Sequence, residues 1–281
     1  MMLLFFFGIG ASSIFTGLSS GAPMLVAGLT LMGVFAAIYH PVGTAMLVGY
    51  AQNRGREIGI NGMWGNLGVA FSALVTGLLV ANFGWRSAFI VPGVIAIALG
   101  LGFAWQVREE PNPVRPHTPL KGAAGQRISM VMVFTVLALA TATGGVVFNA
   151  TTMTYPKLFQ ERLHDVFASP QTLGVVVSLA YAFGAVAQLS IGRVLHRLSL
   201  KWPFVLLTLL QAPLLFALGY VDGWAVIVLG GALMFVVFGQ VTVNDAMVAN
   251  FVAPQWQSRV FALRYCLSFG ASATAIPLIS F

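Results

Sequence analysis

Long apolar runs separated by short polar gaps make up almost the whole chain. Nine of these runs have about the length that a helix needs to cross the roughly 30 Å hydrocarbon core of a bilayer. None of them shows the two-residue alternation that is typical of a membrane-spanning strand. The pattern therefore predicts an all-α integral membrane protein with about nine transmembrane helices. The predicted spans are 2–18, 22–50, 57–83, 86–107, 128–156, 171–194, 203–220, 224–252 and 258–281.

The longest non-apolar segment, 108–127, divides the chain. It contains four prolines, and proline at this density prevents a helix from continuing and favours an extended linker. We therefore predict an N-terminal helical bundle of four spans at 1–107 and a C-terminal bundle of five spans at 128–281. The segment between them is expected to be a cytoplasmic linker.

Charged residues are rare and lie almost entirely in the gaps. The sequence contains 14 Lys and Arg and 7 Asp and Glu among 281 residues, too few to cover the surface of a soluble protein of this length. The net charge of +7 does not indicate nucleic-acid binding, because the basic residues occur in small groups between spans and form no stripe on a folded surface. The composition favours a lipid bilayer as the main partner of the chain.

The basic residues are unequally distributed between alternate gaps. Eleven of the 14 lie in one set of gaps or at the helix entry beside it, and the positive-inside rule places this set in the cytoplasm. The amino terminus is then expected to be cytoplasmic. The eleven residues are Arg54, Arg56, Arg108, Arg115, Lys121, Arg127, Arg193, Arg197, Lys201, Arg259 and Arg264.

The two halves of the chain share a short internal similarity. Ala45-Met46 matches Ala246-Met247 at an equivalent place in the other half, which aligns Thr44 with Asp245. Similarity between halves is typical of transporters that are built from repeats. We therefore expect two pseudo-repeated helical bundles.

Glycines recur at every third residue in the third predicted span, at Gly59, Gly62, Gly65 and Gly68. Small residues let the backbones of two helices approach closely inside a membrane. The spacing predicts a seam where this helix packs against another. A phosphate-binding loop is excluded, because no Lys-Ser or Lys-Thr follows the glycines.

The gap between the sixth and seventh spans carries the clearest motif. Its sequence, Gly192-Arg193-Val194-Leu195-His196-Arg197-Leu198-Ser199-Leu200-Lys201, resembles the cytoplasmic signature of the major facilitator superfamily. Gly192, Arg197 and Lys201 fit the signature, whereas His196 stands where the family prefers Asp. The resemblance implies that this loop tethers neighbouring helices and biases the protein between its inward and outward states.

Two further segments support this resemblance. The run Phe83-Gly84-Trp85-Arg86-Ser87-Ala88-Phe89 is similar to the external joint between the family's fifth and sixth helices. The string Ile38-Tyr39-His40-Pro41 is similar to the fosmidomycin-resistance-like branch of the superfamily. The resemblance implies that the chain covers helices three to eleven of a twelve-helix fold.

Asp245 is the only carboxylate deep within a predicted span. Insertion scales put the cost of an ionisable group there at about 2.5–3.5 kcal/mol, so such a residue usually faces a cavity or a partner. Two interpretations remain open. Asp245 carries a proton or contacts a solute, or it forms an ion pair with Arg264 on the next span.

His40, in the second span, is a further candidate for proton transfer, because histidine titrates near physiological pH. The alternative is a neutral side chain that bonds to a neighbouring helix. Pro41 removes a backbone hydrogen bond, so we expect the helix to be interrupted at this point.

Uncharged polar residues within the spans are candidates for a solute path. The resemblance favours Asn149 and Tyr155, because the family's seventh helix lines the path. Each candidate is equally suited to a hydrogen bond between helices, worth about 0.6–2 kcal/mol. The candidates are Tyr39, Asn61, Asn149, Tyr155, Gln240 and Asn244.

No motif indicates catalysis. The sequence shows no metal-ligand cluster, no nucleophile–base set and no carboxylate pair, and Cys266 is its only cysteine. We predict that the chain is not an enzyme and needs no cofactor.

These observations favour a secondary active transporter in the inner membrane of a bacterium. We expect it to move small organic solutes, by uptake or efflux, through alternating access coupled to a proton gradient, and to act as a monomer. The alternative is a truncated member of the family that does not transport and serves only as a scaffold.

Overall fold

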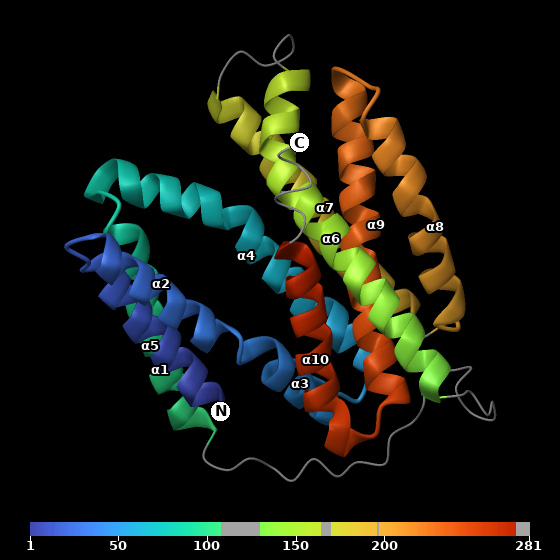
Figure 1. The fold of residues 1–281 in the computed structure, drawn as a ribbon, viewed down its shortest axis with the longest axis horizontal. Coiled ribbons are helices and arrows are strands. Elements are labelled where there is room, and N and C mark those ends of the chain that lie inside the picture. The colour runs from blue at the N-terminus through green and yellow to red at the C-terminus, as the bar shows by residue number, and fades with distance from the viewer. Residues whose placement is uncertain (108–129, 164–169, 196, 274–281) are drawn as a thin grey trace. The chain divides into compact units, whose positions relative to one another are not determined.

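The computed structural model describes residues 1–107, 130–163, 170–195 and 197–273, and these residues form helices without any strand. A helix is present at each of the nine predicted positions (Figure 1). The linker expected at 108–127 and the end of the ninth span lie outside the described residues. The helices are α1 (Met2–Gly17), α2 (Ala22–Ala36), α3 (Thr44–Tyr50), α4 (Arg54–Phe83), α5 (Ser87–Gln106), α6 (Met130–Arg162), α7 (Pro170–Val194), α8 (Lys201–Leu218), α9 (Trp224–Phe251) and α10 (Pro254–Ala273).

Seven helical segments in the described part of the chain are long and apolar enough to cross a membrane. The apolar helix α1 has only 16 residues, and α10 carries Arg259 and Arg264 along its length. The all-α membrane fold predicted from the apolar runs is confirmed. The seven segments are Ala22–Tyr50, Arg54–Phe83, Ser87–Gln106, Phe134–Arg162, Val175–Val194, Lys201–Leu218 and Trp224–Phe251.

The second predicted span is interrupted at Pro41. A π-helical turn, η1 (Tyr39–Gly43), separates α2 from α3 at this proline. Proline has no backbone N–H to continue the regular ladder, and π-turns inside α-helices are frequent at functional sites. The interruption expected from the sequence is therefore a local widening of the helix.

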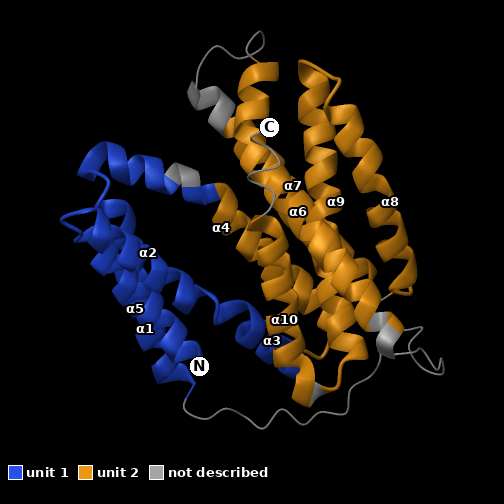
Figure 2. Ribbon diagram, viewed as in Figure 1, with its two compact units in different colours: residues 1–50, 71–115 blue, residues 51–70, 116–281 orange. Residues whose placement is uncertain are grey.

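Contacts divide the chain into two compact units (Figure 2). The first unit comprises Met1–Tyr50 and Phe71–Arg115, and the second comprises Ala51–Ala70 and Pro116–Phe281. The chain passes from the second unit back to the first in the middle of α4. The contacts of Ala51–Ala70 therefore group it with the helices that follow the proline-rich segment in the sequence.

In the first unit, α1 packs against both α2 and α5. Polar side chains reinforce this packing where the helices meet. The Ser13 hydroxyl donates to the Phe89 carbonyl of α5 over 2.7 Å, and Arg86 donates to the Ser19 carbonyl over 3.2 Å. The Ser13 bond gives its hydroxyl a partner between packed helices, as a bilayer requires, and the Arg86 bond ties the loop after α1 to the start of α5.

In the second unit, α9 is the central helix, because it packs against α6, α7, α8 and α10. Seventeen of its 28 residues are buried. The core around it contains Tyr155 and Phe159 of α6, whose rings stack with centroids 5.2 Å apart, and Phe238 of α9. The apolar residues of α9 are distributed around the whole helix and form no single stripe, which is expected of a helix in such a buried place.

The predicted glycine seam joins α4 to α7 within the second unit. A Cβ atom at Gly59 would lie 2.5 Å from the Gln188 carbonyl oxygen and 2.9 Å from the Cα of Gly192. About two turns further along α4, Asn66 donates a buried hydrogen bond of 2.8 Å to the Gln188 side chain. A Cβ at Gly65 would meet no atom within 4 Å, so only part of the glycine row forms the seam.

We predict that Gly59→Ala destabilises the protein by about 1–3 kcal/mol, because the new methyl group would overlap backbone atoms that cannot move aside. The matched change Gly65→Ala should leave stability unchanged or raise it by up to about 1 kcal/mol, since alanine favours a helix interior. Thermal unfolding of the two variants in detergent measures the difference. Equal shifts of the unfolding temperature would contradict the seam.

Candidate functional site

Asp245 of α9 and Arg264 of α10 form an ion pair, with Nη1 of the arginine donating to Oδ1 of the aspartate. The guanidinium also lies over the ring of Tyr265, 5.1 Å from its centroid. Of the two interpretations of Asp245 that the sequence leaves open, the structure thus contains the ion pair. A proton-carrying role is compatible with it, because a carboxylate can exchange one cationic partner for another.

The pair is removed from solvent. Both residues are 8% exposed. Asp245 lies six residues before the end of α9 at Phe251, about 9 Å along the axis at 1.5 Å per residue. Removing one partner of such a pair leaves an uncompensated buried charge, which costs about 3–5 kcal/mol. The two helices are therefore held in one relative position by electrostatics as well as by packing.

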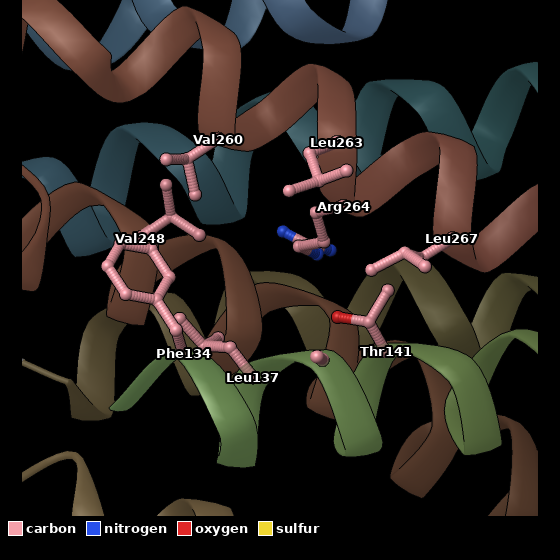
Figure 3. Close-up of a pocket in the computed structure, with 9 residues that line it drawn as sticks. Phe134, Leu137, Thr141, Val248, Val260, Leu263, Arg264 and Leu267 are labelled. Carbon is pink, nitrogen blue, oxygen red and sulfur yellow. The ribbon is translucent and has the colours of Figure 1, made fainter. Parts of the chain in front are cut away.

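A pocket of about 200 Å³ lies beside the ion pair, between α6, α9 and α10. Arg264 reaches it from α10, and the Thr141 hydroxyl points into it from α6 (Figure 3). The rest of its wall is hydrocarbon. The lining residues are Phe134, Leu137, Ala138, Thr141, Val248, Val260, Leu263, Arg264 and Leu267.

Gln240 and Asn244 lie together on α9, each 5% exposed. The Gln240 amide donates to the Asn244 side chain over 3.2 Å, and Thr208 of α8 donates to Gln240 over 3.4 Å. These residues precede Asp245 on the same helix, so α9 carries the largest buried polar segment among the described helices. Their amides are occupied by one another in this conformation.

Asn149 and Tyr155 of α6 both bond to the backbone of other helices. Asn149 donates to the Ser272 carbonyl of α10 over 3.3 Å, and the Tyr155 hydroxyl donates to the Gly230 carbonyl of α9 over 3.0 Å. Tyr155 is 1% exposed and belongs to the core of the second unit. In this conformation its ring and its hydroxyl are both covered by protein.

The remaining candidates lie away from the ion pair along the chain. Tyr39 and His40 form the start of η1 in the first unit, where their rings are 5.5 Å apart and Tyr39 also contacts Phe5. Asn61 is half-buried in α4. A role of these three residues in proton transfer or solute contact stays a prediction.

The loop motif between α7 and α8 is only partly exposed. Gly192 is buried against Gly59 of α4, whereas Arg197 and Lys201 are exposed. His196, the residue that departs from the family signature, lies outside the described residues. The glycine of the motif therefore serves close packing of helices, and its gating role stays a prediction.

The sequence did not identify the residues that close the end of α9. Arg54 of α4, 8% exposed, donates to the Ala249 carbonyl over 2.6 Å. Gln257 of α10 donates to the same carbonyl and to that of Val252, each over 3.2 Å. The last carbonyls of a helix have no partner within it and attract cations, which explains a buried arginine at this place. From the sequence, Arg54 served only as one of the basic residues that place a gap between spans in the cytoplasm.

Comparison with known proteins places the chain in a family. Residues 1–280 match the Major Facilitator Superfamily. The chain is also 31% identical, over 105 residues, to proteins of Chlamydia muridarum and Chlamydia trachomatis that are both named "Probable hexose phosphate transport protein". These 105 residues are 37% of this chain and only 23% of either relative. The family and the names of these relatives agree with the prediction that the chain is not an enzyme. The chain is a multi-pass membrane protein and belongs to the Major Facilitator Superfamily.

Proposed function

We propose that this protein is a secondary active transporter that moves small organic solutes across the bacterial inner membrane by alternating access. The observation that supports this proposal best is the buried ion pair of Asp245 and Arg264 in a member of the Major Facilitator Superfamily. Ionisable residues within membrane spans are costly and are usually retained for function. The basic gaps support an amino terminus in the cytoplasm.

Proton coupling at Asp245 is the mechanism that we propose for energising transport. A proton on the Asp245 carboxylate would compete with Arg264, and its arrival would free the guanidinium and loosen the contact of α9 with α10. A membrane potential supplies about 2.3 kcal/mol per charge per 100 mV, which is similar to the cost of holding one unpaired charge in a span. Breaking a buried ion pair costs about 3–5 kcal/mol, so the potential would supply part of the free energy that opens the pair.

Hexose phosphates are the first solutes to test, because the relatives that match part of the chain are named for their transport. The pair itself is neutral overall, so it does not by itself favour an anionic solute. We propose the wider class of small organic solutes, carried by a monomer, and leave the choice within the class to a panel of labelled compounds.

We predict that Asp245→Asn destabilises the protein, lowering its free energy of unfolding by about 3–5 kcal/mol, because Arg264 then remains buried without a counter-charge. The double variant Asp245→Asn/Arg264→Gln should recover a large part of this loss. The control is Asp222→Asn, which breaks a 2.8 Å pair with Arg162 whose aspartate side chain is 68% exposed. Its loss should be below about 1 kcal/mol. Unfolding of the purified proteins in detergent measures all three, and equal effects of the two single changes would contradict the role of burial.

We also predict that a pH gradient drives solute uptake into proteoliposomes by the wild-type full-length protein and by Asp222→Asn, but not by Asp245→Asn. The asparagine cannot take up a proton, so only exchange of solute for solute should remain. Radiolabelled hexose phosphates and neutral sugars are the assay compounds. An unchanged response of Asp245→Asn to the gradient would refute proton coupling at this residue. If the wild-type protein moves none of the solutes in the panel, the transport proposal itself is refuted.

A further inference from the structure

Two buried side-chain atoms in the described part of the chain have no hydrogen-bond partner. They are Oγ1 of Thr141 and Nε of Arg264. Thr141 is 4% exposed and Arg264 is 8% exposed. Both residues line the pocket between α6, α9 and α10, and they reach it from different helices. The two unsatisfied polar atoms are therefore gathered at one hollow and are not scattered through the protein.

Leaving such atoms unsatisfied is costly. A buried polar group without a partner has given up its hydration, and no hydrogen bond replaces it. Other threonines of α6 bond to carbonyls of their own helix, as buried Thr151 does to Val147 over 2.7 Å and exposed Thr143 does to Leu139 over 2.8 Å. Thr141 has the same chemistry two residues earlier, and its hydroxyl instead points into the pocket (Figure 3).

The charge at the pocket is already balanced. Nη1 of Arg264 is held by Asp245, and Nε–H of the same guanidinium is a buried donor without a partner, so the wall offers a donor that belongs to a neutral ion pair. The other lining residues, such as Leu137, Val248 and Val260, are hydrocarbon. A second charge would find no partner on this wall, which disfavours an ionic ligand.

The volume indicates how large a part of a ligand the pocket can hold. The pocket measures about 200 Å³. An apolar cavity of about 150 Å³ takes up benzene, whereas a buried water needs two to four polar partners. The wall offers only two unsatisfied polar atoms, which are too few to hold a cluster of waters. A molecule a little larger than benzene would instead cover its apolar part.

We propose that this pocket binds a small, uncharged, mainly apolar molecule that carries one oxygen acceptor. The oxygen accepts hydrogen bonds from the Thr141 hydroxyl and from Nε–H of Arg264, and the apolar body packs on the hydrocarbon wall. The ligand would thereby satisfy both buried donors at once. Because it contacts Arg264, it would also stabilise the contact of α6 and α10 around the ion pair. This binding does not require the transport proposal to be correct.

Photolabelling of the purified full-length protein in lipid nanodiscs tests the site. The probe is a benzyl alcohol with a trifluoromethyl-diazirine on the ring, and the matched probe has a methyl group in place of the hydroxymethyl group. Both partition into lipid, but only the alcohol offers an oxygen to the two donors. Peptide mass spectrometry then locates the labelled residues.

Three substitutions separate the parts of the site. Ala138→Phe fills the pocket, Thr141→Val removes the hydroxyl at nearly constant volume, and Arg264→Lys removes Nε–H but keeps a positive charge for Asp245. The control is Thr143→Val, the same substitution on the same helix at an exposed residue. Each variant is first checked for its elution profile, so that an unfolded protein is not scored as a loss of binding.

We expect the alcohol to label α6 and α10 at the pocket at least fivefold more than the methyl probe does, since one hydrogen bond of about 1 kcal/mol corresponds to about that factor. Ala138→Phe should abolish this labelling, Thr141→Val and Arg264→Lys should each reduce it about fivefold, and Thr143→Val should leave it unchanged.

Equal labelling by both probes, or no loss with Ala138→Phe, would overturn the proposal.

Discussion

The ion pair between Asp245 and Arg264 is the interaction on which the second unit depends. α9 packs against four other helices, so a carboxylate in its buried part is largely shielded from water. The charge is tolerated only because α10 brings a guanidinium to the same place. Packing and electrostatics therefore constrain the same two helices, and any event that neutralises the aspartate changes the balance of both.

The same lack of water explains the other polar contacts of the unit. Tyr155 and Arg54 each donate to a backbone carbonyl of α9, and Asn66 bonds to Gln188 across the seam of α4 with α7. Inside a membrane a polar side chain must find a partner in the protein, and small residues bring that partner within reach. Thr141 is the exception that marks the pocket, because its hydroxyl remains without a partner.

The helices could be predicted and the ion pair was one of two open interpretations of Asp245, whereas the contacts of most candidate residues could not be predicted. The length of an apolar run is enough to specify a span. An acid and a base on consecutive spans suggest an ion pair between them. The sequence also suggested a solute path along Asn149 and Tyr155, but both bond to other helices in this conformation. Which way a polar residue faces depends on the helix opposite, and Gly59 and Gly65 show that residues six apart on one helix differ in this respect.

The sequence by itself determined the membrane environment, the positions of the helices in the described part of the chain and the interruption at Pro41. These properties follow from local hydrophobicity and backbone chemistry, which act within a few residues of the chain. Only the tertiary structure decided that Ala51–Ala70 joins the second unit, that Arg54 closes the end of α9 and that Thr141 faces a pocket with Arg264. Those properties arise where helices that are distant in sequence pack together. The local sequence of one helix does not specify which hydrogen-bond partners the opposite helix will present.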